Sequence, residues 1–157
     1  MRHTISVLVQ NEAGALSRIS DMFSSRGYNI EALTVAPTFE GDYSKVTIVT
    51  VGEDREIEQI IKQLHKIIPI VKVTKMEAAN TIQHELMFIK VLVKDESRSE
   101  LIRIAELFGA KILDISQKYY TLQAVGDDRQ INSLIDLLRP MGIKDLVRSG
   151  CVAIARG

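Results

Sequence analysis

Asn11 and Gly14 lie in a short loop that leads directly into a predicted helix, and they are the residues best placed for chemistry. The first N–H groups of a helix have no partner within it, and the helix dipole adds partial positive charge. Such an end therefore suits a carboxylate or a phosphate. Gly14 lets the backbone approach that anion, and Asn11 tolerates a left-handed conformation while offering a side-chain amide. The alternative interpretation is that both residues only form a tight turn.

The elements on either side of this loop follow from the spacing of apolar residues. Alternation across residues 5–9 predicts a strand, and an apolar stripe at Leu16, Ile19 and Phe23 predicts a helix. The helix ends at residues 24–27, because the glycine in the last position can adopt the left-handed conformation of a helix cap. A strand, the loop and a helix are thus expected in that order.

The rest of the first half completes a recognisable architecture. Residues 28–35 and 45–51 predict a β-hairpin, residues 54–66 a second helix, and residues 70–73 a fourth strand. The order strand, helix, strand, strand, helix, strand indicates a ferredoxin-like βαββαβ unit of the α+β class. Its two helices cover one face of a mostly antiparallel sheet.

The same order of elements is predicted a second time after a polar stretch. We therefore expect two tandem ferredoxin-like domains, at residues 1–76 and 84–157, joined by a linker at 77–83. The second set consists of a strand at 84–93, a helix around Leu101 to Phe108, strands at 112–116 and 120–125, a helix around Ile131 to Leu138, and a strand at 146–155.

The two halves differ at the loop. When the apolar stripes of their first helices are aligned from Leu16 and Leu101, Gly14 corresponds to Ser99. The second loop therefore lacks the glycine, and it carries acidic side chains where an anion would have to lie. If the first loop binds a carboxylate, the second should not. In that alignment Asn11 corresponds to Glu96, and the other acidic residues there are Asp95 and Glu100.

Composition excludes several classes of function. The chain has 157 residues, 46% of them hydrophobic, with 20 basic and 20 acidic residues and no run of like charges. It is long enough for a packed core, and its charge does not indicate binding to nucleic acid or to an anionic membrane. No membrane helix or signal peptide is predicted. The single cysteine, Cys151, fits a reducing compartment, so we expect a cytoplasmic protein in which this thiol is packed.

Catalytic and metal-binding patterns are missing from the sequence. His3, His65 and His84 are scattered, and neither a phosphate-binding glycine motif nor a nucleophile motif occurs. The acidic pairs at residues 53–54 and 127–128 precede predicted helices, where they cap the first turn. No acid–base or metal chemistry is expected.

The residues around the loop resemble a known family. NEAGALSRISDMFSSRGYNIEALTVAPT, at residues 11–38, is similar to the ACT domain of the small regulatory subunits of acetohydroxyacid (acetolactate) synthase. The loop pattern N-x-x-G-x-L is only moderately specific, but its extension from Arg26 to Val35 is much more so. The likeness continues through QLHKIIPIVKV to SGCVAIARG, so it covers essentially the whole chain.

The resemblance implies a non-catalytic partner of the thiamine-diphosphate-dependent large subunit, in valine, leucine and isoleucine biosynthesis. Such a subunit raises the activity of the large subunit and makes it sensitive to a branched-chain amino acid, usually valine. The family pairs two N-terminal ACT domains side by side, with the effector at their interface. The resemblance places thiamine diphosphate, Mg and FAD on the catalytic subunit and no cofactor on this chain.

Site residues carried over from the resemblance form two groups. The loop holds the effector carboxylate, and Asn29 and Ile30 of the partner chain address its amino group and line the side-chain pocket. Leu33 and Val35 also line this pocket. Such a pocket separates similar aliphatic side chains by only ~1–3 kcal/mol per methylene. Alternatively, Asn29 is a structural polar residue. The loop residues are Asn11, Ala13, Gly14, Ala15 and Leu16.

Two other functions remain open from the sequence. The chain could be a free-standing amino-acid sensor of the ACT type that controls another target, or it could itself be an enzyme. Co-purification with a thiamine-diphosphate enzyme addresses the first alternative, and a turnover assay on pyruvate with the isolated chain, expected to be blank, addresses the second.

Overall fold

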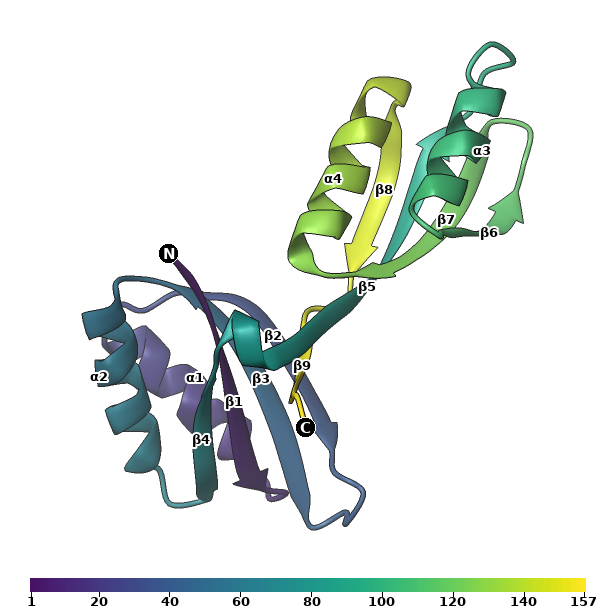
Figure 1. The fold of residues 1–157 in the computed structure, drawn as a ribbon. Helices are drawn as coiled ribbons and strands as arrows, with labels where there is room; N and C mark the ends of the chain where they lie inside the picture. The colour runs from purple at the N-terminus through teal and green to yellow at the C-terminus, as the bar shows by residue number, and fades with distance from the viewer. The chain divides into compact units, whose positions relative to one another are not determined.

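The computed structural model describes all 157 residues, and their contacts divide the chain into two compact units. Unit 1 comprises Met1–Ile82 together with Cys151–Gly157, and unit 2 comprises Gln83–Gly150. In each unit two helices lie on one face of a sheet (Figure 1). The predicted α+β class with two βαββαβ-like sheets is confirmed.

Unit 1 has the strand order β2-β3-β1-β4, in which all neighbours are antiparallel. The edge strand β2 pairs with β3 as the predicted hairpin, and the central strand β1 ends just before the loop of interest. The elements are β1 (Arg2–Gln10), α1 (Ala15–Ser25), β2 (Ile30–Pro37), β3 (Tyr43–Val51), α2 (Asp54–His65) and β4 (Ile70–Met76).

Unit 2 repeats this topology with the order β6-β7-β5-β8. A short 3₁₀ helix, η1 (Ala78–Asn80), precedes it within the predicted linker. The elements that follow are β5 (Thr81–Leu92), α3 (Arg98–Leu107), β6 (Lys111–Ile115), β7 (Tyr119–Gly126), α4 (Asp128–Leu138), the 3₁₀ helix η2 (Arg139–Met141) and β8 (Ile143–Arg148), and the last strand of the chain is β9 (Val152–Ala155).

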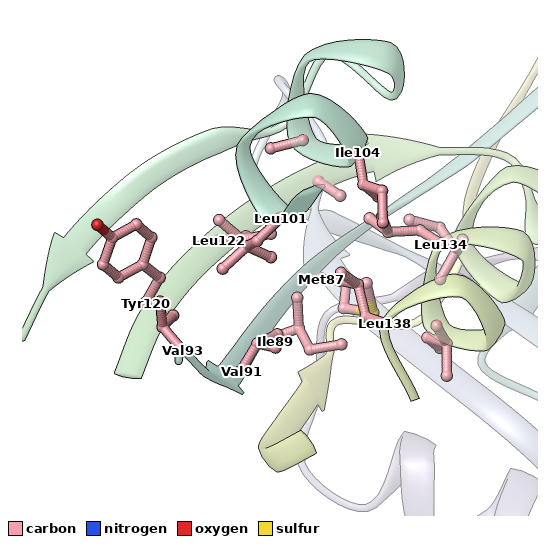
Figure 2. Packing of buried hydrophobic residues seen from close by; sticks show 14 residues of the cluster. Met87, Ile89, Val91, Val93, Leu101, Ile104, Tyr120, Leu122, Leu134 and Leu138 are labelled. Carbon is pink, nitrogen blue, oxygen red and sulfur yellow. The ribbon is translucent and has the colours of Figure 1, made fainter. Parts of the chain in front are cut away.

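Each unit has its own core between sheet and helices. In unit 2 the side chains of Met87 and Ile89 on β5 lie beneath Leu134 and Leu138 of α4 (Figure 2). In unit 1 the corresponding core contains Ile5 of β1, Ile48 of β3 and residues of both helices. Full burial of each such side chain contributes about 1.5–3 kcal/mol to folding, so these two cores hold the loops of each unit on a rigid base.

The first predicted helix face was wrong by one residue at its start. Ala15, Ile19 and Phe23 are the buried residues of α1, whereas Leu16 is 42% exposed. Residues four apart lie on one side of a helix, so Ala15 and not Leu16 continues the stripe through Ile19 and Phe23. Leu16 faces outward beside the loop.

The last predicted strand divides into two, and its second part lies in unit 1. β8 ends at Arg148, Gly150 has a positive φ of 88°, and β9 then pairs with β5. The backbone N–H of Arg156 donates to the carbonyl of Asn80 at 2.8 Å. The structure therefore differs from the expected domain at residues 84–157, because its final residues pack with the first unit.

The acidic pairs before α2 and α4 form the expected caps. Gln130 N–H donates to Asp127 Oδ1 at 2.8 Å, and Asp127 N–H donates to Gln130 Oε1 at 2.9 Å, which completes a capping box. Glu53 and Glu56 form the same arrangement at α2. None of the helices combines the length and the apolar character needed to span a bilayer.

Candidate functional site

Gly14 is the N-cap of α1 and has the left-handed backbone angles φ 84° and ψ −6°. An L side chain at this position would be strained, although the space around its missing Cβ is open. Glycine therefore allows the chain to turn from β1 into α1 while its backbone stays uncovered. The predicted role of Gly14 as a turn residue matches this geometry, and its role towards an effector stays a prediction.

The first turn of α1 offers hydrogen-bond donors without partners in the chain. Ala15 N–H makes a long bond to Glu12 O at 3.4 Å, and Arg18 N–H donates to Gly14 O at 3.1 Å. Between them, the N–H groups of Leu16 and Ser17 donate to no group of the chain. No acidic residue lies in this turn. The helix dipole is therefore not neutralised, and the turn can accept an anion.

Asn11 fixes the loop to the β2–β3 hairpin rather than turning the chain. Its backbone N–H donates to Asp42 O at 2.9 Å, and its side-chain Nδ2 donates to Gly41 O at 3.3 Å. Only glycines have positive φ in this structure, so the left-handed conformation considered for Asn11 does not occur.

Asn29 and Ile30 lie at the start of β2. The carbonyl of Asn29 accepts a hydrogen bond from Thr50 Oγ1 at 2.7 Å, and Ile30 lies opposite Thr50 in the sheet. Thr50 is only 1% exposed, so the backbone at Asn29 is held by a buried group, whereas the Asn29 side chain is exposed.

Strand register separates the predicted site residues within one chain. Val35 lies opposite Val46, near the end of β2 where the strand approaches the loop, because Pro37 and Val9 both lie opposite Ser44. Ile30 lies at the other end of β2. The structure thus brings Asn11, Ala13, Gly14, Ala15 and Leu16 together in one loop and places Val35 at the near end of the edge strand. It leaves Asn29 and Ile30 at the far end.

The edge strand β2 presents apolar side chains next to α1. Leu33 and Val35 lie opposite the core residues Ile48 and Val46, so they point to the helix side of the sheet. They are nevertheless 36% and 43% exposed. Together with the outward-facing Leu16, they form an apolar margin beside an unpaired strand edge, which is the kind of surface another strand can extend.

The equivalent loop of unit 2 is built differently. Ser97 is the N-cap of α3, with φ −107°, and its Oγ accepts from Lys94 N–H at 3.1 Å and donates to Lys94 O at 3.2 Å. Asp95 and Glu96 are exposed in the same loop, and Asp95 pairs with Arg98 at 3.2 Å. A hydrogen bond with Tyr120 and then this pairing raise the pKa of Arg98 above its ordinary value.

The helix ends show that the aligned position of Ser99 was wrong. Gly27 and Gly109 both follow the C-caps with positive φ, and the next N–H in each case returns to the residue five positions earlier. The two turns superimpose if Phe23 matches Ala105. Since α1 has 11 residues and α3 has 10, the N-cap positions then make Ser97 the counterpart of Gly14. The expected contrast remains, because a bonded serine beside acidic residues replaces the open glycine.

Sequence reasoning missed the residues that hold Asn11 and Asn29 in place. Gly41 and Thr50 contribute through hydrogen bonds to Asn11 and Asn29, across long separations in the chain. The turn residues at 38–43 and the β-branched run at 45–51 could be recognised in the sequence. The pairing register of the hairpin could have indicated which of these residues lie beside Asn11 and Asn29. The three histidines lie on β1, α2 and β5, and no three His, Cys, Asp or Glu residues are grouped as metal ligands.

Two family models match the chain in tandem. Residues 5–72 match the model described as the AHAS small subunit-like ACT domain, and residues 84–157 match the small subunit of acetolactate synthase. Both matches fall on the units that carry the contrasting loops.

Several relatives are similar over the full length. The chain is 42% identical to the probable acetolactate synthase small subunit of Archaeoglobus fulgidus, over 100% of the chain and 98% of that protein. It is 44% identical to the acetolactate synthase small subunit of Buchnera aphidicola, with 100% of both chains covered. For the isozyme 3 small subunit of Escherichia coli the identity is 40%, over 100% of the chain and 97% of the relative.

A solved structure shares the whole fold. The crystal structure of the acetolactate synthase small subunit of Thermotoga maritima matches with a TM-score of 0.90 and 32% identity, over 100% of this chain and 98% of that one. The chain therefore belongs to the family of acetolactate synthase small subunits, which are regulatory and non-catalytic.

Proposed function

We propose that this chain activates the catalytic large subunit of acetolactate synthase and makes it sensitive to feedback inhibition by valine or a related branched-chain amino acid. The observation that carries the proposal is the uncovered first turn of α1 behind Gly14. Its two partnerless N–H groups, Leu16 and Ser17, can take the carboxylate of an amino acid at a dipole that no acidic side chain neutralises.

The residues that bind the amino group and the side chain of the effector come from a second copy of the chain. Asn29 and Ile30 lie at the end of β2 that is remote from the loop, so one chain cannot bring both groups to one small ligand. If the β2 edges of two copies pair antiparallel, the far end of one strand comes to the loop of the other. The apolar margin of Leu16, Leu33 and Val35 supports this homodimer, because pairing removes it from water.

Only the first unit takes the effector in this proposal. In unit 2 the cap hydroxyl of Ser97 is bonded to Lys94, and Asp95 and Glu96 repel a carboxylate. A dimer therefore carries two equivalent effector sites, both built from unit 1.

The chain needs no cofactor of its own for this task. Thiamine diphosphate, Mg and FAD belong to the catalytic subunit in the proposal, and this chain supplies binding and control. An effector shifts the activity of the assembly only through its different affinity for the two states, typically by ~1–3 kcal/mol.

Calorimetry with valine on the purified chain and assays of the reconstituted synthase test the proposal. Gly14→Asp places a carboxylate on the anion position and should abolish valine binding and valine inhibition. The matched control is Gly109→Asp, because Gly109 has a comparable positive φ of 64° in unit 2 and the same open surroundings. It should cost similar stability and leave valine binding intact. Unchanged inhibition in folded Gly14→Asp would refute the loop assignment.

A further inference from the structure

Arg148 is the centre of a charged cluster inside unit 2. Its Nε donates to Glu85 Oε1 at 2.9 Å, and its Nη2 also contacts that oxygen and lies 3.3 Å from Asp128 Oδ1. Its Nη1 donates to Asn132 Oδ1 at 3.0 Å. We call Glu85, Asp128, Asn132 and Arg148 the Arg148 cluster.

The cluster is only partly buried: the Glu85 carboxylate is buried, the side chains of Arg148 and Asp128 are 30% and 43% exposed, and Asn132 is exposed. Glu85 is a charged residue that is only 8% exposed, and it is followed on β5 by the apolar residues Leu86 and Met87. Partial burial lowers the pKa of Arg148, but the contacts with Glu85 and Asp128 outweigh this effect and raise it above its ordinary value. A buried ion pair seldom adds more stability than well-packed apolar side chains would. Stability alone therefore does not account for the cluster.

The position of the cluster indicates another role. The chain passes between the units twice, after Ile82 and after Gly150. Glu85 lies on β5 just after the first passage, and Arg148 ends β8 just before the second. Two hydrogen bonds reinforce this junction, because Ser149 N–H donates to Leu86 O at 2.9 Å and Leu86 N–H donates to Ser149 Oγ at 3.0 Å. Both connecting segments are thus fixed to each other within unit 2.

The cluster also extends to a helix. Asp128 and Asn132 lie in the first two turns of α4, so Arg148 joins the ends of both connecting segments to the start of that helix. The corresponding corner of unit 1 is looser. There Asp54, the first residue of α2, is 71% exposed in its side chain and lies 3.9 Å from Lys75 and 3.6 Å from His3.

We propose that the Arg148 cluster couples effector binding in unit 1 to the response of unit 2. This inference rests on the proposed function. Arg148 acts as a positioning residue: it touches neither effector nor substrate and ties the two chain passages to α4. Loss of the cluster should therefore separate binding from response.

The test uses the full chain reconstituted with the catalytic large subunit. Glu85→Met/Arg148→Leu replaces the ion pair with two apolar side chains, so no single charge is left buried. We expect valine affinity by calorimetry and activation of the large subunit to stay within about twofold of wild type. The valine concentration for half-inhibition should rise at least tenfold, or inhibition should become incomplete.

The matched control is Glu100→Met/Arg103→Leu, which removes an exposed ion pair of 2.8 Å on α3 of the same unit. It should leave binding, activation and inhibition unchanged. If the first double variant does not fold, Arg148→Lys keeps the charge but loses the fork that contacts three side chains, and it should still weaken inhibition without weakening valine binding. A normal valine response in a folded cluster variant overturns the inference. A wild-type chain that neither binds valine nor activates the large subunit overturns the proposed function instead.

Discussion

The side-chain amide of Asn11 donates to the backbone carbonyl of Gly41 at 3.3 Å, which joins the β1–α1 loop to the turn of the β2–β3 hairpin. The loop that is proposed to hold the effector carboxylate is therefore positioned by the turn that follows β2, the strand of the proposed dimer edge. A change in the position of the β2–β3 hairpin should therefore also change the position of the β1–α1 loop.

Asn11→Ala should weaken valine binding about two- to tenfold, because one hydrogen bond of this kind contributes ~0.5–1.5 kcal/mol. The backbone bond from Asn11 to Asp42 remains, so the fold should persist. Calorimetry with valine measures the effect. Asn80→Ala, at an exposed position of η1, is the control. Equal valine affinity in Asn11→Ala and wild type would show that the hydrogen bond from Asn11 to Gly41 does not order the site.

Thr50→Val should destabilise unit 1 by about 1–3 kcal/mol, because it removes the buried donor to Asn29 O without changing the side-chain shape. Chemical denaturation with circular dichroism measures the loss. Thr34→Val on β2 is the control, and its effect on the free energy of unfolding should have the opposite sign. The Thr34 hydroxyl is buried without a partner, so its removal should be neutral or stabilising by up to about 1 kcal/mol. Equal losses in both variants would contradict this distinction.

Ile19→Ala should cost about 2–5 kcal/mol of unfolding free energy, because Ile19 is fully buried in the core of unit 1. Leu16→Ala should change the stability of the monomer by less than about 0.5 kcal/mol, since its side chain lies outside that core. Thermal unfolding at low protein concentration compares the two variants. A large loss in Leu16→Ala under these conditions would mean that Leu16 packs as the original helix stripe predicted.

Val35→Lys should break the proposed homodimer while leaving each chain folded. Val35 is 43% exposed on the edge strand β2, so a lysine is tolerated in the monomer but has to leave water inside the apolar interface when β2 edges pair. Sedimentation analysis measures the assembly. Val71→Lys, at a 53% exposed valine on the opposite edge strand β4, should leave the mass unchanged. Retention of the dimer in Val35→Lys would exclude this edge as the interface.

Apolar spacing predicted the repeated fold because sheets and helices bury residues at fixed periods. The alternation along β1 and the stripe of α2 therefore located these elements within a few residues. The same spacing could not place Leu16, because two adjacent apolar residues at a helix start leave the buried face ambiguous. The burial of Ala15, Ile19 and Phe23 in the folded chain settles it.

Only part of the candidate site could be predicted from the sequence. The glycine before α1 and the absence of acids in its first turn could be recognised locally. The partners of Asn11 and Asn29 could not, because Gly41 lies in the β2–β3 turn and Thr50 on β3, and only the sheet register brings them close. The Arg148 cluster could not be predicted from the sequence for the same reason, since its four residues are spread from β5 to β8.

The return of β9 to unit 1 has a consequence for biosynthesis. Residues 151–157 complete the unit whose first strand starts at Arg2, and the whole of unit 2 lies between them. During translation, unit 2 leaves the ribosome in full before unit 1 receives its last strand. Unit 1 is thus begun before unit 2 and finished after it, so a nascent chain that stalls within unit 2 exposes a unit 1 that still lacks residues 151–157.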